Sequence, residues 1–437
     1  MKPGYKQTEI GVIPEDWDAV TFSTCFQVLK NNTLARAELN YDAGTVKSIH
    51  YGDILIKYRS LLDADSDKIP YITEPSKRVP LSYLQDGDLI IADTAEDETV
   101  GKAVELKGAT GQKIVAGLHT IPCRPADRDM FANGWLGYFI NHSIFHDQLL
   151  PLITGTKVSA ISKSALANTV VLVPNDKKEQ ERIAEALSDA DDLISSLEKL
   201  IEKKKDIKQG AMQQLLTGKT RLPGFCKEWK TQKWGEVLEG FISGATPFRG
   251  QSSYYIGKNK WVSSGELNYN HIVETKEHIS DLAIRETSLV LHPAGTFLMA
   301  ITGLEAEGTR GSCAMLDCVA TTNQSCLAIY GTKTLDINFL YHYYVLKGNE
   351  LAFQYCQGTK QQSYTATIVK SLPIVYPSDT QEQVAISSIL SDMDDEINQL
   401  ESKLEKARQV KQGMMQQLLI GKIRFLYDCE VNRNGEK

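Results

Sequence analysis

The chain contains the stretch KQGAMQQLL at Lys208–Leu216 and repeats it as KQGMMQQLL at Lys411–Leu419. The two copies are 203 residues apart (411 minus 208), and this shift aligns residues 173–221 with residues 376–424 without a gap. It also reaches back to Gly155-Thr156-Lys157 and Gly358-Thr359-Lys360. Farther upstream the two halves diverge. The sequence therefore repeats two segments, residues 173–221 and 376–424, which we call the frame, and the sequence that precedes each of them differs.

Each repeated segment has the signals of a long amphipathic helix. Asp176 with Glu179, and Asp379 with Glu382, have the spacing of capping boxes at a helix start. Gly218 and Gly421 suit left-handed C-terminal caps. Between the caps an apolar seam steps by four and then three residues, as in a coiled coil. Its apolar positions are Ile183, Leu187, Ile194, Leu197 and Ile201 in the first helix, and Ile386, Leu390, Ile397, Leu400 and Leu404 in the second.

The charges along these helices favour antiparallel pairing. Each helix is rich in acidic residues early and in lysine late, so only opposite directions set acid against base. We therefore expect an intramolecular antiparallel coiled coil, in preference to homodimerisation through a single helix. Lys204, Lys208 and Lys411 interrupt the seam, and we expect the pairing to loosen there. From Ile183 to Leu215 such a rod would be roughly 48 Å long.

The helices divide the chain into five parts. Residues 1–174 (module 1) and 223–377 (module 2) combine short apolar runs with turn residues, which predicts an α+β fold in a pseudo-twofold arrangement. Residues 175–222 and 378–427 are the long helices, and residues 428–437 are expected to be disordered. Strands are expected at residues 88–92, 170–173, 296–300 and 326–330, and module helices at residues 135–149 and 336–346.

Composition narrows the functional classes. The 437 residues carry a net charge of -7, so any nucleic-acid binding has to be local. The sequence shows neither a signal peptide nor an apolar run of transmembrane length, and its eight cysteines form no CxxC pair. These features predict a soluble, cytoplasmic protein without a disulfide framework. Cys313, Cys318 and Cys326 do not match a standard zinc spacing, and we interpret them as buried thiols before a metal site.

The repeated helix ends, the opening stretch Tyr5–Trp17 and the segment Ser243–Pro247 resemble the specificity (S) subunit of type I restriction-modification systems over essentially the full length. This resemblance implies two target recognition domains that read the two halves of an asymmetric bipartite DNA site. It also implies helices that dock methyltransferase subunits, probably two, and association with restriction and motor subunits. The chain itself would have no catalytic activity and no cofactor. S-adenosylmethionine, ATP and Mg would belong to the partner subunits, which methylate adenine or cut DNA.

One catalytic alternative comes from the residues themselves. Asp88, Glu105 and Lys107 could imitate the acidic pair and lysine of a stand-alone metal-dependent nuclease. A scaffold without DNA contact is a weaker third possibility.

Candidate contact residues follow from chemistry alone. For DNA they are cations and amides near turns and aromatic residues, with turn formation or solvated surface charge as the alternative explanation. They are Thr156, Lys157, Thr359, Lys360, Lys57, Arg59, Arg249, Lys258, Lys260, Arg310, Asn323 and Gln324. For partner docking, glycines inside the long helices suggest the close approach of another helix, with apolar side chains beside them. These candidates are Gly210, Met212, Leu216, Gly413, Met415 and Leu419.

Overall fold

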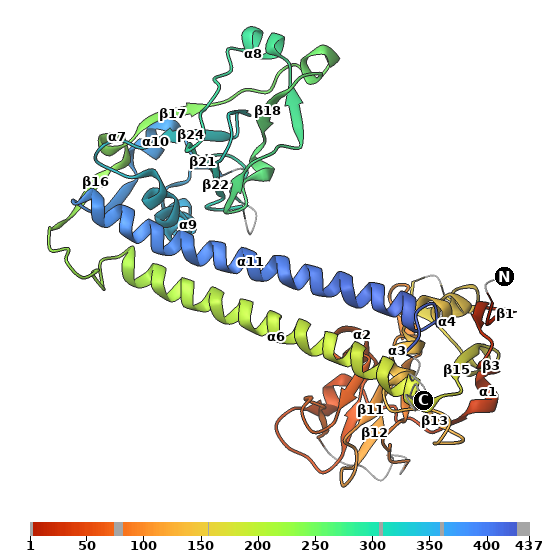
Figure 1. Cartoon of the computed structure of the whole chain (residues 1–437). Helices are drawn as coiled ribbons and strands as arrows, with labels where there is room; N and C mark the ends of the chain where they lie inside the picture. Colours follow the sequence, from red (N-terminus) through yellow and green to blue (C-terminus); the bar gives the residue numbers. More distant parts are fainter. Residues whose placement is uncertain (1–2, 74–81, 156, 306–308, 359–361, 426–437) are drawn as a thin grey trace, which may run out of the picture. The chain divides into compact units, whose positions relative to one another are not determined.

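The structure is a computed structural model that describes residues 3–73, 82–155, 157–305, 309–358 and 362–425 (Figure 1). Its contacts divide the chain into two units. Unit 1 contains Met1–Glu198 and Ser402–Lys437, and unit 2 contains Lys199–Glu401. The boundaries at 198 and 401 are 203 residues apart (401 minus 198), which is the shift of the sequence repeat. Each unit thus contains one module, the first part of the helix that follows it, and the last part of the other long helix.

A five-stranded sheet forms the centre of each unit, and its strands have the same spatial order in both. The order is β4-β13-β9-β11-β7 in unit 1 and β17-β24-β21-β22-β19 in unit 2. Neighbouring strands are antiparallel except the last pair, which is parallel in each sheet. The strands are β4 Phe26–Val28, β7 Leu61–Asp63, β9 Leu89–Ala92, β11 Ala103–Lys107, β13 Thr120–Pro125, β17 Glu239–Ser243, β19 Asn270–Ile272, β21 Phe297–Ala300, β22 Cys313–Leu316 and β24 Cys326–Tyr330.

Apolar side chains fill both faces of the sheet in unit 1. Along β9, Leu89 and Ile91 belong to one core cluster and Ile90 and Ala92 to another. This alternation follows from the two-residue period of a strand. The first cluster also contains Trp135 and its neighbours, so the aromatic helices of the module cover that face.

The last strand of each module pairs with a strand near the start of that module. In module 1, β3 (Trp17–Thr21) is antiparallel to β15 (Val170–Pro174), and Trp17 lies opposite Pro174. In module 2, β16 (Trp229–Lys233) is antiparallel to β25 (Pro373–Pro377), and Trp229 lies opposite Pro377. Each long helix therefore begins directly beside this early strand of its module.

The two long helices are α6 (Lys177–Leu215) and α11 (Thr380–Leu418), drawn yellow-green and blue in Figure 1. Lys411 binds Asp191 and Arg408 binds Glu198 in unit 1, while Lys205 binds Glu401 in unit 2, each at 2.6–2.7 Å. Partner numbers rise on α6 as they fall on α11, so the predicted antiparallel pairing is confirmed. Gly218 and Gly421 have φ angles of 70° and 67°, which confirms the predicted left-handed caps.

We expected the lysines in the seam to loosen the pairing of the two helices, but each of them forms an ion pair across the helices. Lys411 reaches Asp191 at 2.6 Å, Lys204 reaches Glu396 at 2.6 Å, and Lys208 binds Asp394, each across the two helices. Their long side chains carry the charge out of the apolar seam to acidic residues of the opposite helix. The interruptions are thus ion-paired contacts of the seam.

Two predicted module helices have different bounds from those expected. Residues 135–149 form two helices, α3 (Trp135–Ile140) and α4 (Ser143–Leu149). The chain breaks at Asn141, whose side chain bonds the backbone of Ala103, and at His142, whose ring accepts the amide of Ile144.

The other helix, α9 (Ile337–Tyr355), continues nine residues past its predicted end at residue 346. Gly348 lies inside this helix. In the structure it packs against the backbone of Gly311, where a side chain on either glycine would collide.

Smaller elements complete the units. The sheet orders are β12-β6-β8-β5 and β10-β14 in unit 1, β20-β18-β23 in unit 2, and β1-β2 near the start of the chain. In the described part of the chain, no helix has the length and apolarity to cross a membrane. The bounds are β1 Tyr5–Thr8, β2 Gly11–Pro14, α1 Phe22–Cys25, β5 Leu39–Asn40, β6 Lys47–Ile49, α2 Tyr51–Ile56, β8 Tyr71–Ile72, β10 Thr94–Ala95, β12 Ile114–Ala116, β14 Ser159–Ala160, α5 Lys163–Ala167, α7 Trp234–Val237, β18 Asn259–Val262, β20 Glu277–Ile279, α8 Asp281–Thr287, β23 Ala320–Thr322 and α10 Ala366–Ser371.

Candidate nucleic-acid interface and its helical frame

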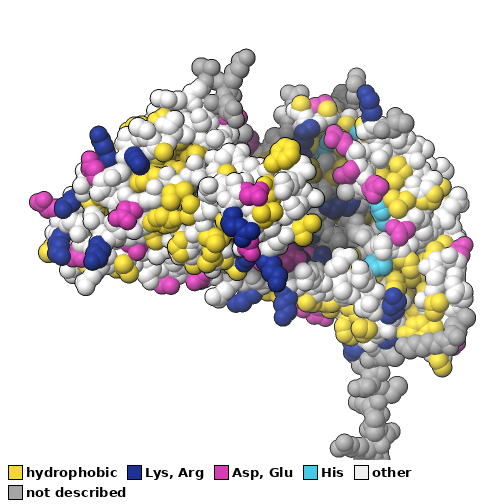
Figure 2. Space-filling model, turned by 90° about the horizontal axis from the view of Figure 1, so that it is seen from above, with side chains coloured by type: hydrophobic (Ala, Val, Ile, Leu, Met, Phe, Trp, Pro, Cys, Tyr) yellow, Lys and Arg dark blue, Asp and Glu magenta, His cyan; other side chains and the backbone are white. Residues whose placement is uncertain are grey.

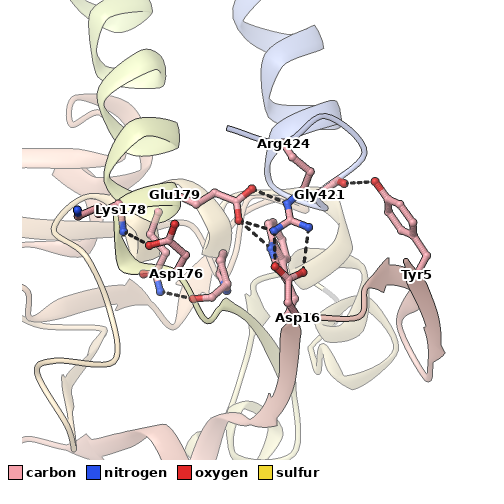
Figure 3. A network of polar contacts seen from close by, with 10 residues as sticks. Tyr5, Asp16, Asp176, Lys178, Glu179, Gly421 and Arg424 are labelled. Atoms are coloured by element: carbon pink, nitrogen blue, oxygen red, sulfur yellow. Dashed lines mark hydrogen bonds and ion pairs between the residues drawn. The ribbon is translucent and has the colours of Figure 1, made fainter. Parts of the chain in front are cut away.

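An arginine just past the end of one long helix binds a glutamate in the first turn of the other. In unit 1, Arg424 donates to both oxygens of Glu179 at 2.5 and 2.8 Å and to both oxygens of Asp16 at 2.9 and 2.7 Å (Figure 3). In unit 2, Arg221 donates to both oxygens of Glu382 at 2.6 Å. The two pairs are related by the repeat shift of 203, and both glutamates are fully buried.

The predicted capping boxes are only half formed, because the aspartates cap the helices and the glutamates do not. Asp176 and Asp379 do accept the amides of Lys178 and Gln381, at 3.0 and 3.1 Å, and so cap their helices. The glutamates, however, leave the caps and turn toward the arginines. Glu179 also accepts the indole N–H of Trp17 at 3.1 Å. A hydrogen bond from Arg424 keeps the pKa of Asp16 below its ordinary value.

A second pair of equivalent contacts joins each module to the helices. Lys411 and the hydroxyl of Tyr138 both donate to Asp191, at 2.6 and 2.9 Å. In unit 2, Lys208 binds Asp394, and these two residues are related to Lys411 and Asp191 by the repeat shift. The ring of His342, 204 residues after Tyr138, lies 4.0 Å from the Asp394 carboxylate. His342 is 1% exposed, and burial together with nearby Lys208 lowers its pKa to about 3, so the ring is neutral.

The nuclease alternative is wrong because its carboxylates lie on opposite faces of one sheet. Glu105 lies opposite Leu89 on β9, so its side chain points to the face covered by α3. There it accepts the amides of Gly134 and Gly137 at 2.6 and 2.8 Å and caps α3. Asp88, one residue earlier than Leu89, points to the other face and accepts two bonds from Arg124 at 2.8 and 2.6 Å.

The other members of that set are also engaged elsewhere. Lys107 pairs with Asp63 at 3.2 Å. Burial raises the pKa of Glu105 to about 7, although the amides at the start of α3 favour its charged form. Within the described ranges, no three His, Cys, Asp or Glu side chains are grouped as a metal site would require. Cys313 and Cys326 are buried in strands of the central sheet of unit 2, where burial raises their thiol pKa values.

The two candidate DNA-contact residues of module 1, Lys57 and Arg59, face different parts of the structure. Lys57 ends α2 and donates to the backbone oxygen of Lys68 at 2.6 Å, with its ammonium 4.4 Å from the ring centre of Tyr41. Arg59 instead pairs with Asp192 on α6 at 2.9 Å. The structure thus keeps Lys57 on the open surface of the module and turns Arg59 toward the helical frame.

Lys57 lines a pocket of 840 Å³ that the sequence analysis missed. Arg36, Tyr41 and Asp53 form one wall, and His50, Tyr51 and Lys68 lie around it. Arg36 and Asp53 carried no signal because this part of the module has no counterpart at the 203-residue shift. Arg36 and Asp53 come together only in the folded module, where their side chains are 2.5 Å apart.

The DNA candidates of module 2 have more varied surroundings. Arg249 binds both oxygens of Glu277 at 2.5 and 3.1 Å. Lys260 bonds the oxygen of Val273 at 2.5 Å, and Lys258 is exposed just before β18. The remaining candidates have local partners: Arg310 bonds the oxygen of Leu304, Asn323 accepts the amide of Ser325, and Gln324 accepts the hydroxyl of Thr246.

The described residues on either side of the two Gly-Thr-Lys segments form equivalent bridges. Thr154 and Ala160 form an antiparallel bridge, and so do Gln357 and Ser363, 203 residues further on. Lys157 is exposed. Thr156, Thr359 and Lys360 lie outside the described residues, as does the tail at 428–437. On the face drawn in Figure 2, the described Lys and Arg side chains are interspersed with Asp and Glu on both units.

The docking candidates divide into open and buried positions. A side chain on Gly210 or Gly413 would meet nothing within 4 Å, so neither glycine serves close packing within the described chain. Met212, Leu216 and Leu419 are at most 2% exposed and belong to the cores of their units, and Met415 is half-buried against the core of unit 1. We therefore withdraw Met212, Leu216 and Leu419 as docking side chains, because contact with a partner would remove them from those cores.

Known proteins share both sequence and fold with this chain. A family model described as "Type I restriction modification DNA specificity domain" matches residues 226–408. The putative type I restriction enzyme MjaX specificity subunit of Methanocaldococcus jannaschii is 24% identical over 444 residues, covering 96% of each chain. The MjaIX specificity subunit of the same organism is 28% identical over 173 residues, covering 39% of this chain and 38% of that one.

Two solved structures have the same fold. The crystal structure of a type I restriction-modification S subunit from M. genitalium matches with a TM-score of 0.61 at 13% identity, covering 96% of this chain and 99% of that one. A chain from a study of complex assembly and conformational transition of the type I system matches with a TM-score of 0.51 at 14% identity, covering 94% and 99%. With its duplicated helices and paired modules, this chain is similar in sequence and in fold to the specificity (S) subunits of type I restriction-modification systems.

Proposed function

We propose that the two modules of this specificity subunit read the two halves of an asymmetric, bipartite DNA target, one half per module, and leave the spacer between them unread. The subunit determines the DNA target of its complex and is not itself catalytic. What is proposed is the division of that task between residues 1–174 and residues 223–377.

The observation that supports this division is the contrast between frame and module. The Arg–Glu contact between helices recurs at a shift of 203, and the central sheets have the same strand order. The residues around these shared features differ: Lys57 and Lys68 line a pocket in module 1, whereas Tyr255 and Trp261 lie under Arg249 in module 2. A common frame with different surfaces is what two different half-sites require.

Module exchange tests the proposal directly. Residues 1–174 are replaced by those of a relative, the subunit is assembled with its modification subunits, and the methylated motif is determined by sequencing. One half of the motif should change while the other half and the spacer remain. The matched exchange of residues 223–377 should change only the other half. A change in both halves from either exchange would overturn the proposal.

A pure scaffold would behave differently in a binding titration. If the subunit contacts DNA, the affinity of the assembled complex should fall steeply with salt, because bound cations release the counterions of phosphates. Exchange of a module should also shift the preferred duplex. A complex whose DNA affinity is indifferent to both exchanges would make the subunit a scaffold.

The proposal includes partners of the chain. Two modification subunits would dock on the two equivalent helix ends, bringing S-adenosylmethionine, and restriction subunits would bring ATP and Mg. The docking face on each helix would contain Gly210 with Ile207, and Gly413 with Val410. Ile207 and Val410 are related by the repeat shift and are 47% and 52% exposed. Such a complex acts on DNA in the cytoplasm, the location expected from the sequence.

A bulky residue at the glycines tests this docking face. Gly413→Trp should weaken co-purification with the modification subunit, because the indole would hold an approaching helix away, and should leave the isolated chain folded. Lys403→Trp, at an exposed position ten residues away on the same helix, is the matched control. Unchanged co-purification of both Gly413→Trp and Gly210→Trp would exclude this face.

A further inference from the structure

Arg36 and Arg249 occupy equivalent positions in the two modules, although the sequence repeat does not align them. Each arginine lies four residues after a backbone amide that binds the parallel strand pair of the smaller sheet: Asn32 N binds Ala116 O at 2.8 Å, and Ala245 N binds Thr322 O at 3.1 Å. Within the two strand pairs, Gly117 N binds Ile49 O at 2.8 Å and Asn323 N binds Val262 O at 2.9 Å. The offset is 213 for the binding amides, for β6 and β18, and for the arginines (245 minus 32, 262 minus 49 and 249 minus 36), and it is 206 for the residues at the ends of β12 and β23 (322 minus 116 and 323 minus 117).

In module 1, the guanidinium of Arg36 is held in a fixed orientation. One terminal nitrogen donates to Asp53 at 2.5 Å and the other to the hydroxyl of Tyr41 at 2.8 Å, and that hydroxyl also donates to Asp53 at 3.1 Å. Asp53 is 6% exposed, whereas the side chain of Arg36 is half exposed. The buried carboxylate therefore orients an arginine that faces the pocket.

The surroundings of Arg36 are those of a nucleic-acid subsite. The guanidinium carbon lies 5.3 Å from the ring centre of Tyr41. Lys57 and Lys68 add two further cations around the pocket, and Ile56 beside them is 89% exposed. Cations interleaved with aromatic and apolar groups suit DNA, which offers phosphates, base edges and thymine methyl groups together.

In module 2, Arg249 has a similar arrangement built from different residues. Glu277 holds its two terminal nitrogens, and its guanidinium lies 4.5 Å from the ring centre of Tyr255 and 5.1 Å from that of Trp261. The neighbouring Phe248 is 72% exposed. An oriented, exposed arginine on an aromatic platform is thus present at the same place in both modules.

We propose that Arg36 and Arg249 are the equivalent specificity-determining residues of the two modules, each reading a guanine edge in the major groove of its half-site. The inference rests on the proposed function, since it needs each module to read one half-site. A guanidinium has five N–H donors, and two are used within the protein in each case. Three donors remain, which is enough for the two-bond contact to guanine O6 and N7. Lys57 contacts a neighbouring phosphate.

The test uses the assembled complex of this chain with its modification subunits and duplexes that carry the methylated motif. A second set of duplexes has each base pair of one half-site changed in turn. Arg36→Ala should weaken binding of the cognate duplex by about 5- to 150-fold and abolish discrimination at one G·C pair of one half-site. Arg249→Ala should do the same in the other half-site only.

Two further variants separate base reading from phosphate contact and from misfolding. Arg36→Lys keeps the charge beside Asp53 but loses the planar fork, so it should lose discrimination while keeping the salt dependence of binding. Lys57→Ala should weaken all duplexes alike and reduce the salt slope by roughly one. Arg128→Ala and Arg285→Ala remove other exposed arginines of the two modules and serve as matched controls.

The outcomes distinguish this inference from the function on which it rests. If the wild-type complex does not discriminate between half-site variants, the proposed function fails. If it discriminates and Arg36→Lys and Arg249→Lys discriminate equally well, only the assignment of these arginines is overturned. Equal weakening on every duplex, with a reduced salt slope, would show that they contact phosphate and would likewise overturn it.

Discussion

The two units solve the same structural problems with partly different residues. In both, an arginine past the end of one long helix neutralises a buried glutamate at the start of the other. In unit 1, Glu179 has additional partners around it, because Trp17 donates to it and Asp16 shares Arg424. In unit 2, Trp229 occupies the place of Trp17 but its indole N–H has no bonding partner in the described structure. Both units share the arginine–glutamate pair, but the additional polar partners around that pair differ between them.

The module helices differ in the same way. In module 1, α3 is capped from a distant strand by Glu105. In module 2, the local residue Asp336 accepts the amide of Phe339 at 2.9 Å and caps α9. Met315 holds the strand position that Glu105 has in module 1, because both lie opposite the first residue of the central strand. The two modules therefore differ even in the residues that cap their buried helices, α3 and α9.

Removal of the frame arginines should have the largest effect on stability. Arg221→Ala would leave Glu382 buried without its partner and should cost about 3 kcal/mol of unfolding free energy. Arg424→Ala should cost less, because Glu179 keeps the Trp17 N–H. Urea unfolding measures both. In Arg221→Ala/Glu382→Gln the buried charge is gone, so much of the loss should be recovered. Equal losses in the two arginine variants would show that Trp17 contributes nothing.

Substitution of the capping carboxylates should distinguish the two modules next. Glu105→Ala leaves two buried amides of α3 without an acceptor and should cost about 2 kcal/mol. Asp336→Ala removes an ordinary N-cap and should cost about 1 kcal/mol. Glu105→Gln, which keeps one acceptor oxygen, is the control. Thermal unfolding compares them, and a larger effect at Asp336 would contradict this ranking.

The pH dependence of unit 2 should depend on His342. Its folded pKa of about 3 lies below the ordinary value of 6.5, so the unfolded chain binds a proton that the folded ring does not. The contribution is fully present above pH 6.5 and is lost as pH falls toward 3, at up to about 1.4 kcal/mol per pH unit.

The matched variant is His342→Tyr, which introduces the residue type that contacts the equivalent aspartate, Asp191, in module 1. It should flatten the loss of unit 2 stability between pH 6.5 and 5, while Tyr138→His should add such a loss to unit 1. Chemical unfolding at a series of pH values, followed for each unit, measures both. A His342→Tyr curve parallel to that of the wild type would rule out the role of this ring.

The smallest effects are expected at the exposed ion pairs between the long helices. Arg408→Ala and Lys205→Ala break pairs whose partners are about half exposed, and each should change stability by less than about 0.5 kcal/mol. Lys411→Ala, which leaves the nearly buried Asp191 with only the Tyr138 hydroxyl, should exceed both. If all three are alike, burial of Asp191 has no energetic consequence.

Much of the frame could be predicted because it is local and repeated. Heptad spacing, terminal glycines and the charge gradient predicted two antiparallel helices, and all of these signals lie within short stretches of sequence. The roles of Glu179 and Glu382 could not be predicted, because the capping motif says nothing of an arginine 245 or 161 residues away. Packing over such separations depends on the assembled fold.

The candidate interface was less predictable for a related reason. Side chains such as Lys57 and Arg249 were found by composition, but Arg36 and Asp53 come together only when η1 (Arg36–Glu38) lies against α2. The equivalence of Arg36 and Arg249 appears only in strand register, where the offset is 213 instead of 203. Arg59 and Glu105 illustrate the opposite error: their residue types suggested DNA binding and catalysis, but Arg59 pairs with Asp192 of α6 and Glu105 caps α3.

The division into units also bears on how the chain is made. Unit 2 is one continuous stretch, whereas unit 1 needs Ser402 and the residues that follow it. During synthesis, every segment of unit 2 emerges before unit 1 can close, and Glu179 must wait for Arg424. Closing unit 1 joins residues as far apart as Tyr5 and Gly421, whose hydrogen bond is 2.8 Å long. Such distant contacts form slowly, so module 1 should be the late-maturing half of a protein whose halves are otherwise alike.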